Sequence, residues 1–294
     1  MTTLFYYEYS SFYLESTYKI AASKTTGEVK KVELMFKSTP QEAAVLRAAV
    51  DSRCEGIYAK ITPDMTEYDI VKLFHDELIR SVRYDKGSEY GESVYGALVE
   101  GVASCQGYSK AFAYLCDGYG IPNIIVTGEA SGPHMWNMVM LGDSWYHLDI
   151  TNDDPGNTQY SNHVKYKYFL INDGRLSETH TVDVQPFAYP AAQSETPDYF
   201  RLNGIYAESY SQAVGIAYNE LLRAAGTGAD GVELRCSDDA VFAEVYEKFF
   251  KKAELLDIVE VVNKSAVRRF NVAAIAYSAE NDGTNVIEIY LTYE

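Results

Sequence analysis

The chain has 294 residues, of which 47% are hydrophobic and 23% are charged, a composition that supports a packed core and disfavours a disordered chain. Its formal net charge of −17 disfavours binding to nucleic-acid phosphates and to anionic lipid, so neither is expected as a partner. No run of about 18 apolar residues is present, and no membrane span is predicted.

The beginning of the chain shows no signal peptide. Met1 to Thr3 lead into the sequence FYYEYSSFY, which lacks the basic and apolar regions that such a peptide needs. Either the protein is intracellular, or the chain is a fragment to which a start methionine was added. We expect an extracellular or cell-surface protein whose signal segment is missing from this chain, with a cytoplasmic location as the alternative.

Changes of pattern divide the chain into four segments, and the fold class predicted for the whole is α+β. Residues 1–65 are predicted to form a β-hairpin and a helix, which pack on the next segment or are the remnant of a preceding domain. Residues 66–190 hold the candidate reactive residues. Prolines within 186–197 indicate a linker at 191–200, and residues 201–294 form a smaller C-terminal domain.

The C-terminal segment alternates between strand and helix patterns. Strands are predicted at 203–208, 231–237, 270–278 and 285–293, and helices at 211–225 and from 238 to about 262. The order βαβαββ predicts a small α/β sandwich. No motif for a phosphate, a metal or a nucleophile occurs in it, so we interpret it as a binding or spacer module.

Two helices are predicted before the reactive segment. The first follows Pro40, and the second begins at Thr66, which can cap it together with Asp69. His75 lies on the second helix, where a structural or surface role is more common than catalysis. The glycine-rich stretch 86–101 is predicted to be mostly loop and leads to the next helix.

The four cysteines form no CxxC pair and are too few for a disulfide framework. Cys54, Cys116 and Cys236 are expected to be small buried hydrophobic residues. Cys105 differs because it lies in the first turn of a predicted helix that ends at Gly120. The unpaired N–H groups and partial positive charge of a helix N-terminus favour a thiolate and can form an oxyanion hole, so Cys105 is a candidate nucleophile. Taken alone, a buried structural cysteine is an equally good interpretation.

A β-hairpin is predicted downstream, in HMWNMVMLGDSWYHLDIT. If Gly142 and Asp143 are the two loop residues, Trp136 faces Asp149 and His134 faces Thr151. His134 and Asp149 then become diagonal neighbours on one face, about 7 Å apart at Cβ. A slip of one residue would put them on opposite faces. A carboxylate beside an imidazole selects its tautomer, and such a base can activate a nearby thiol. These placements favour catalysis.

The residues in this stretch carry a family resemblance. Cys105-Gln106-Gly107-Tyr108, His134-x-Trp136-Asn137 and Trp145-Tyr146-His147-Leu148-Asp149-x-Thr151 resemble the transglutaminase-like superfamily, with further matches at His75-Asp76-x-Leu78, Val82-x-Tyr84-Asp85 and Tyr168-Phe169-Leu170-Ile171. The resemblance covers about residues 66–190. It implies a papain-like core, in which a helix bearing the cysteine packs on an antiparallel sheet bearing the histidine and the aspartate.

By this resemblance, Cys105 is the nucleophile, His134 the general base and acid, and Asp149 the orienting residue. Gln106, Trp136, Tyr95 and Thr151 are expected to bind substrate or to support the oxyanion. The sequence departs from the family at two places. Asn152 stands where many bacterial members have Trp, and Met135 stands where a small residue is more usual, so the substrate groove is expected to differ.

No metal or other cofactor is expected. Residues 153–157 could suggest a calcium loop, but they lack the alternating ligands and the bidentate glutamate of an EF-hand, so a turn is favoured. His147 is interpreted as a bystander near the site. His163 and His180 lack the spacing of metal ligands.

Two classes of function follow. The first is a thiol enzyme that acts on amide bonds of a peptide or protein substrate through an acyl-enzyme. Hydrolysis by a peptidase or amidase is slightly preferred to amine transfer by a transglutaminase. The second is a non-catalytic surface binding or adhesion module on the same scaffold. In either class, the partner could be a cell-wall or surface protein.

Overall fold

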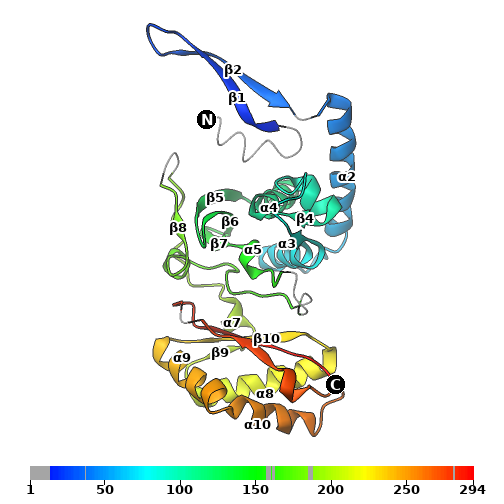
Figure 1. The fold of residues 1–294 in the computed structure, drawn as a ribbon, viewed down its shortest axis with the longest axis vertical. Helices are drawn as coiled ribbons and strands as arrows, with labels where there is room; N and C mark the ends of the chain where they lie inside the picture. Colours follow the sequence, from blue (N-terminus) through cyan, green and yellow to red (C-terminus); the bar gives the residue numbers. More distant parts are fainter. Residues whose placement is uncertain (1–13, 37, 157–159, 161–162, 185–187, 281) are drawn as a thin grey trace. The chain divides into compact units, whose positions relative to one another are not determined.

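The computed structural model describes residues 14–36, 38–156, 160, 163–184, 188–280 and 282–294, and its ribbon is drawn in Figure 1. It is a mixed α+β structure. The chain forms two compact units, Met1–Thr127 with His134–Leu141, and Gly128–Pro133 with Gly142–Glu294. The predicted boundaries after residues 65, 190 and 200 stay predictions, and residues 1–13 of the first predicted segment lie outside the described residues.

The first elements of the chain are a β-hairpin and a helix, as predicted. Strands β1 (Leu14–Ala22) and β2 (Val29–Phe36) pair antiparallel around a turn that contains Gly27 at a φ of +71°. Helix α2 (Pro40–Tyr58) begins with a capping box, in which the Thr39 side chain accepts from the Glu42 N–H and the Glu42 carboxylate accepts from the Thr39 N–H.

Helix α3 (Glu67–Ser81) confirms the predicted start at Thr66. The Thr66 side chain accepts from the Asp69 N–H, and the Asp69 carboxylate accepts from the Thr66 N–H. The short strands β3 (Arg83–Tyr84) and β4 (Val102–Ala103) pair parallel. Between them, the predicted loop contains one π-helical turn, η1 (Gly96–Glu100).

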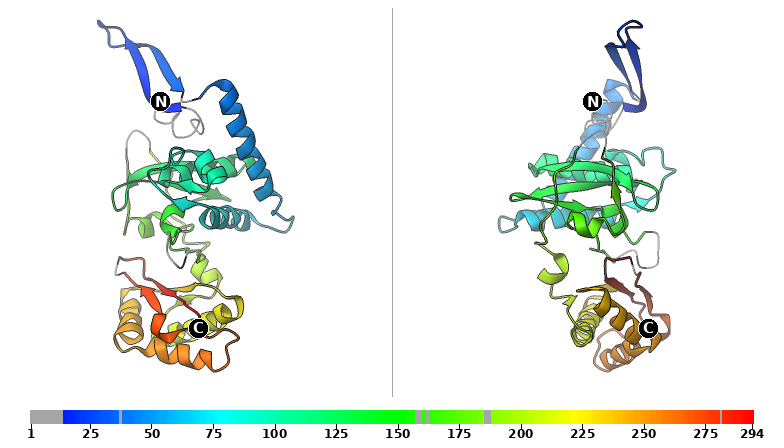
Figure 2. Two further views of the ribbon diagram at one scale, coloured as in Figure 1. Left: turned by 45° about the vertical axis from the view of Figure 1, so that its right-hand side comes forward. Right: turned by 90° about the vertical axis from the view of Figure 1, so that its left-hand side faces the viewer.

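Helix α4 (Cys105–Tyr119) starts where it was predicted to start. It ends at Gly120, whose φ of +85° suits glycine. Figures 1 and 2 show α4 beside strands β5 (Asn123–Glu129) and β6 (Pro133–Leu141). The Asn137 side-chain N–H of β6 donates to the Ser109 carbonyl of α4 over 3.0 Å.

Strands β5 and β6 belong to a four-stranded sheet in the order β7-β6-β5-β8, where β7 is Ser144–Leu148 and β8 is Thr181–Val182. The predicted two-residue turn between β6 and β7 is confirmed, since Gly142 and Asp143 lie between the strands and Gly142 has a φ of +56°. Because β7 ends at Leu148, the predicted pairing of Thr151 with His134 across the sheet is wrong. Asp149 instead caps a short helix, α5 (Ile150–Asp153).

The remaining elements confirm the predicted order of the four C-terminal strands, but two α-helices, not one, lie between the second and third of them. After α6 (Asp173–Leu176) and α7 (Tyr199–Leu202) come β9 (Tyr206–Ala207), α8 (Tyr210–Thr227), β10 (Gly231–Cys236), α9 (Asp239–Tyr246), η2 (Glu247–Lys251), α10 (Glu254–Asn263), η3 (Val272–Ala274), β11 (Ala276–Ser278) and β12 (Val286–Tyr290). The sheet order is β11-β12-β10-β9, with β9 parallel to β10 and the other pairs antiparallel.

The long helix predicted from residue 238 to about 262 is wrong, because it is broken at Ala253. This residue has a φ of +60°, which ends one helical stretch before α10 begins. The break lets α9 and α10 pack separately. Helices α8 and α10 lie on one face of the sheet (Figure 2), and a hydrophobic core that includes Leu221, Leu234 and Val259 joins them to it.

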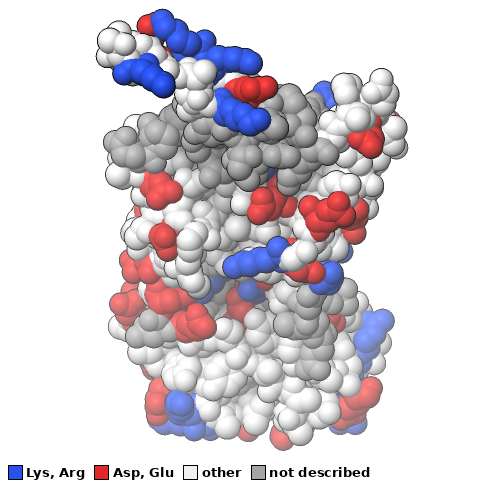
Figure 3. All heavy atoms as spheres, turned by 45° about the horizontal axis from the view of Figure 1, so that its top comes forward, with Lys and Arg blue, Asp and Glu red and all other residues white. Residues whose placement is uncertain are grey.

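The described helices include none that is long and apolar enough to cross a membrane, which agrees with the sequence. Figure 3 shows one face of the molecule, where acidic side chains form several patches and basic side chains gather over the β1–β2 hairpin. That hairpin carries Lys19, Lys24, Lys30 and Lys31. The strong net negative charge therefore coexists with a small basic region.

Candidate functional site

Cys105 is the first residue of α4 and has a free, half-buried thiol. It packs against a small cluster formed by Ala113 of the same helix, Ile125 of β5 and Met135 of β6. Met135, noted in the sequence as a departure from the family, thus belongs to the cluster on which Cys105 packs. The other three cysteines, Cys54, Cys116 and Cys236, are free and buried, as predicted.

Among the described residues, no side chain caps the N-terminus of α4. The residue at the N-cap position, Ser104, turns away from the helix, and both its hydroxyl and its N–H donate to the Gly91 carbonyl, over 3.2 and 2.8 Å. At α3, by contrast, the N-cap side chain accepts from a first-turn N–H. The first-turn N–H groups of α4 are therefore kept from a side-chain cap, which suits stabilisation of a thiolate or an oxyanion.

Gly107 lies in the same turn and allows the Gly91 segment to approach. A Cβ at position 107 would lie 2.4 Å from the Gly91 carbonyl oxygen and 2.8 Å from the Ala103 Cβ. Any larger residue would push this segment away and disturb the two hydrogen bonds that hold Ser104. Close packing against the Gly91 segment thus explains why position 107 of the Cys105-Gln106-Gly107 motif is a glycine.

His134 is the second residue of β6 and is half-buried. Its ring stacks on Trp136, which is two residues further along the strand, with ring centroids 6.0 Å apart and an interplanar angle of 22°. Alternate residues of a strand share a face, so this contact follows from the strand itself. Trp136 is 1% exposed, so the imidazole of His134 stacks on a buried ring.

Asp149 follows β7 directly and is 1% exposed. Its carboxylate has hydrogen-bond partners in Asn152 and His180. The Asn152 N–H donates to Oδ1 over 3.2 Å, the Asn152 side-chain N–H donates to Oδ2 over 2.7 Å, and His180 Nε2 lies 3.0 Å from Oδ2. The carboxylate is therefore held from two directions, by the helix that it caps and by a histidine from a distant part of the chain.

The remaining predicted binding residues have distinct surroundings. Gln106 is half-buried, and its Oε1 is buried without a hydrogen-bond partner among the described residues. Tyr95 is half-buried and packs edge-on against Tyr90 at 5.2 Å between ring centroids. Thr151 lies inside α5, away from the strand position at which it was predicted. Their assignment to substrate binding stays a prediction.

One group of described residues offers ligand atoms to a metal ion. A ring nitrogen from each of His134 and His180 and a carboxylate oxygen of Asp149 all lie within 4.8 Å of one another. The predicted pair His134 and Asp149 is thus joined by His180, which sequence reasoning set aside. In residues 153–156, the Gly156 N–H donates to the Asp154 carboxylate over 2.7 Å, which is a turn, as predicted. Asn157 lies outside the described residues.

A family model described as the Transglutaminase-like superfamily matches residues 55–150 of the chain. Cys105, His134 and Asp149 all fall inside the matched range. Residues 55–150 are a transglutaminase-like superfamily domain. The resemblance inferred from the motifs is thereby confirmed for this part of the chain. No curated protein matches the chain.

Three solved structures are similar to the chain at low identity. A TGase has 17% identity and a TM-score of 0.35, over 49% of this chain and 46% of its own. A protein from Cytophaga hutchinsonii that is assigned as a cysteine protease has 12% identity and a TM-score of 0.32, over 62% and 80%. Menin, whose structure reveals a binding site for the MLL protein, has 14% identity and a TM-score of 0.31, over 77% and 52%. The chain spans less than half of the length of the TGase, and at these TM-scores the similarities do not bear on activity.

Two further histidines of the predicted motifs serve the structure. In the transglutaminase-like domain, His75 is fully buried and its Nδ1 lies 3.0 Å from Asp76 Oδ1. Burial acts to raise the pKa of Asp76, but the hydrogen bond and charge of His75, together with Lys72, lower it to about 2. His147 is buried, and its Nε2 lies 2.9 Å from Asp173 Oδ1; burial lowers its pKa despite this carboxylate.

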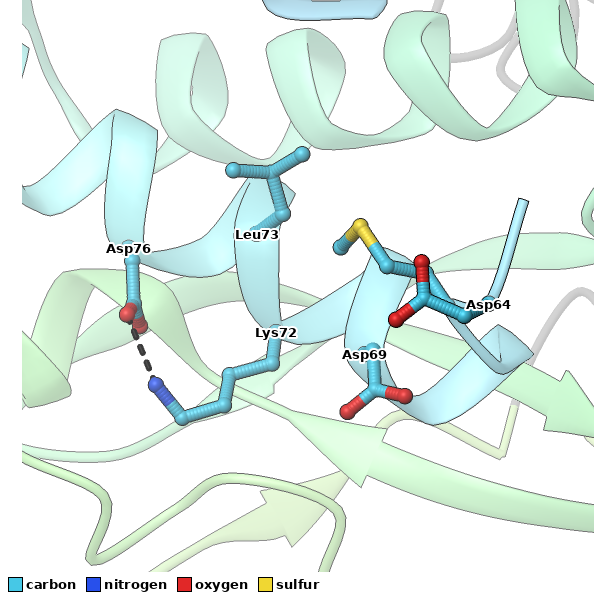
Figure 4. Close-up of a pocket in the computed structure, with 6 residues that line it drawn as sticks. Asp64, Asp69, Lys72, Leu73 and Asp76 are labelled. Atoms are coloured by element: carbon cyan, nitrogen blue, oxygen red, sulfur yellow. Dashed lines mark hydrogen bonds and ion pairs between the residues drawn. The ribbon is translucent and has the colours of Figure 1, made fainter. Parts of the chain in front are cut away.

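A hollow beside α3 contains several charged residues, as Figure 4 shows. Its volume is about 380 Å³, and it is lined by Asp64, Met65, Asp69, Lys72, Leu73 and Asp76. Lys72 donates to Asp76 over 2.8 Å, and Asp69 belongs to the capping box of α3. The charges of Lys72, Asp69 and Asp76 therefore have local partners.

A second cavity, of about 410 Å³, lies against the residues that support Asp149. Asn152, Thr179 and His180 line it on one side, and Lys167 and Glu288 are among its other lining residues. Lys167 pairs with Asp282, and Lys165 lies 3.9 Å from Glu288. The cavity is therefore polar, and several of its charged side chains form ion pairs with one another. It is relevant to the candidate site because His180 is one of its lining residues.

Proposed function

We propose that this protein is a thiol enzyme that acts on amide bonds of peptides or proteins, with Cys105 as nucleophile, His134 as general base and acid, and Asp149 as the orienting carboxylate. The observation that carries the proposal is the free thiol of Cys105 at a helix N-terminus that no described side chain caps. The closeness of ligand atoms from His134 and Asp149 supports the roles of the other two residues.

The proposed reaction has two steps. His134 accepts the thiol proton, the Cys105 sulfur attacks the amide carbonyl carbon, and first-turn N–H groups of α4 stabilise the oxyanion. The protonated imidazole then gives its proton to the leaving amine as the C–N bond breaks, leaving a thioester. In the second step, water or a second amine loses a proton to His134, attacks the thioester and releases the thiol of Cys105.

Hydrolysis and amine transfer differ in the molecule that attacks the thioester. We favour hydrolysis because water is always present and an amine subsite is not evident in the sequence. A peptide library incubated with and without a primary amine distinguishes the two outcomes. Cleaved peptide in both samples supports a peptidase or amidase, whereas a mass increase that requires the amine supports transfer.

The substrate class and the location are also proposals. A peptide or protein substrate, including a protein of a cell wall or cell surface, fits a thiol that is only half-buried. Fractionation of the natural source and detection of the protein would test the proposed extracellular or cell-surface location. Recovery with the cytoplasmic fraction would contradict it.

The activated thiol can be tested by alkylation with iodoacetamide, because the other cysteines are internal controls. Burial raises the pKa of Cys54 and of Cys236 to about 12, and it raises the pKa of Cys116 well above its ordinary value. At pH 7, we therefore expect rapid labelling at Cys105 and slow labelling elsewhere, measured by mass spectrometry of the digested protein.

His134→Ala separates an activated thiol from a merely accessible one. In this variant, Cys105 should react more slowly near neutral pH, and the difference should shrink at high pH, where the thiol ionises without a base. Cys105→Ala should remove the fast label altogether. If Cys105 reacts no faster than Cys54, or equally fast with and without His134, the site is idle and the binding-module function gains support.

A further inference from the structure

His180 is the residue that the structure adds to the predicted site. Its Nε2 lies 3.0 Å from Asp149 Oδ2, and both side chains are 1% exposed. The two residues are separated by 31 positions in the sequence. A buried histidine bonded to the carboxylate that orients the base is in a position to affect the reaction without touching the substrate.

The surroundings of His180 fix the position of its ring. Its backbone N–H donates to the Leu176 carbonyl over 2.9 Å, at the end of α6. On the ring, Nδ1 lies 2.8 Å from the Thr179 hydroxyl, and the Tyr168 ring packs edge-on at 5.1 Å between centroids. Both ring nitrogens therefore have partners, and the ring cannot turn without breaking them.

The hydrogen bonds also define the tautomer. An ionised Asp149 can only accept, so the 3.0 Å contact assigns a proton to His180 Nε2. The Asn152 side-chain N–H lies 3.3 Å from the same nitrogen but donates to Asp149 Oδ2 at 2.7 Å. Nδ1 of a neutral imidazole then accepts from the Thr179 hydroxyl. The charged residues that line the same cavity as His180 are Lys165, Lys167, Glu280, Asp282 and Glu288. Burial, and in smaller part the charge of His180, lowers the pKa of His147. The His180 N–H thus stabilises the ionised form of Asp149.

Two neighbours hold the Asp149 carboxylate. Asn152 donates to both of its oxygens, and His180 Nε2 lies within hydrogen-bond distance of Oδ2. These two residues hold Asp149 from its own helix and from the loop before β8, and a ring nitrogen of His134 lies within 4.8 Å of one of its oxygens. Asn152, a departure from the family motif, takes part in this support through its side chain.

We propose that His180 is a positioning residue, which fixes the charge and orientation of the Asp149 carboxylate so that it can orient His134. This inference rests on the proposed function, in which His134 is the base for Cys105. It assigns His180 a role that a purely structural histidine would not have. Removing its N–H should change the reactivity of the thiol, beyond any effect on stability.

The test compares four full-length variants with the wild type. His180→Leu removes the donor at similar volume, and His180→Gln restores a side-chain N–H. His163→Leu removes another buried histidine in the same unit and serves as the matched control. His134→Ala reports the contribution of the base. The measurement is the rate of Cys105 alkylation by iodoacetamide from pH 5 to 9.

We expect His180→Leu to slow labelling at pH 7 by about tenfold, the change that corresponds to the loss of one hydrogen bond to a charged group. The pH profile should move toward that of His134→Ala. His180→Gln should recover most of the rate, and His163→Leu should keep the wild-type profile even if it unfolds at a lower temperature. An unchanged profile in His180→Leu, or equal slowing in His180→Leu and His180→Gln, would overturn the inference.

Two further results separate this inference from the function on which it rests. Equal labelling of the wild type and His134→Ala contradicts the proposed function and the role of His180 together. Labelling that depends on His134 but not on His180 contradicts the inference alone. If His180→Leu does not fold, ¹⁵N NMR of the histidine rings in the wild type still decides, because we expect a proton on His180 Nε2 at pH 7. A proton on Nδ1 alone would overturn the inference.

Discussion

The two halves of the candidate site are built in different ways. The region of the nucleophile, from α3 to the end of α4, is held by helix signals and by backbone hydrogen bonds, such as those from Ser104 to the Gly91 carbonyl. The region of the carboxylate, residues 142–182, is held by buried side chains that bond to one another over long sequence separations, such as Asp149 with His180. The first kind of construction can be read from short motifs, and the second cannot.

This difference predicts different weaknesses. A region held by close backbone contacts is sensitive to added volume, whereas a region built from buried polar side chains is sensitive to the loss of one partner and to mild acid. The carboxylate region contains the three histidines His147, His163 and His180, all buried. Each of the following experiments tests one side of this contrast.

The largest effect is expected for Asp149→Ala, in the carboxylate region. The substitution removes the cap of α5 and leaves the half-buried Asn152 and the buried His180 with one acceptor fewer, so we expect a loss of about 3 kcal/mol in the free energy of unfolding. Urea denaturation monitored by circular dichroism measures it. A loss below that of the simple cap substitution Thr66→Ala would show that the buried network contributes little.

An effect of similar size is expected from acid at His163. Burial, with the charges of Lys165 and Arg223, lowers the pKa of His163 to about 4, and its Nε2 has no hydrogen-bond partner among the described residues. Because the folded protein favours the neutral ring, stability is complete above pH 6.5 and declines as the pH falls toward 4, by about 3 kcal/mol.

His163→Leu tests this source of acid sensitivity. The variant should lose less stability than the wild type between pH 7 and pH 4, as measured by urea denaturation at each pH. Parallel stability curves for the two proteins would show that His163 does not titrate in this range.

In the nucleophile region, Gly107→Ala is expected to destabilise the protein by about 1–3 kcal/mol, because the new Cβ would lie 2.4 Å from the Gly91 carbonyl oxygen. Gly56→Ala is the matched control, since Gly56 is also helical and its Cβ would meet nothing within 4 Å. That variant should gain about 0.5–1 kcal/mol. If both substitutions stabilise the protein, the close approach at Gly107 is not a constraint.

These contrasts explain how much the sequence could reveal. The starts of α3 and α4 and the turn at Gly142 were predicted, because caps, glycines and apolar stripes are local signals. The predicted strand through Thr151 failed, because the Asp149 side chain bonds the Asn152 N–H and begins a helix there. The alternating sequence pattern is compatible with a strand and with a helix after Leu148. The hydrogen bond from the Asn152 N–H to the Asp149 side chain favours the helix.

His180 could not be found in the same way. It precedes a two-residue strand, has no helical or metal-ligand spacing, and meets Asp149 through the tertiary fold. The break at Ala253 was missed for a related reason, since alanine favours helix and its left-handed conformation there depends on the packing of α9 and α10. Local signals suggested the candidate site residues, whereas the contacts that hold these residues in place are not encoded in short motifs.

The acid sensitivity of the nucleophile region is expected at much lower pH than that of the carboxylate region. The pKa of Asp76 is lowered to about 2 in the folded protein, so its contribution of about 2 kcal/mol is present above pH 3.8 and is lost as the pH falls to 2. Asp76→Asn should therefore destabilise the protein at pH 5 and have little effect at pH 2. Urea denaturation measures the difference in the free energy of unfolding between the variant and the wild type. An equal difference at pH 5 and pH 2 would mean that the charge of Asp76 is not the source of its stabilising effect.

The smallest effect is expected for Ser104→Ala. The lost hydrogen bond to the Gly91 carbonyl is worth about 0.5–1 kcal/mol, and no cap is lost because Ser104 does not cap α4. Cys105 should therefore keep its rate of alkylation by iodoacetamide.

Ser104→Asp should behave differently, because a carboxylate at the N-cap can accept from the first-turn N–H groups and places a negative charge beside the thiol. This variant should be at least as stable as Ser104→Ala but should label more slowly. Faster or equal labelling in Ser104→Asp would contradict the view that the uncapped helix N-terminus activates Cys105.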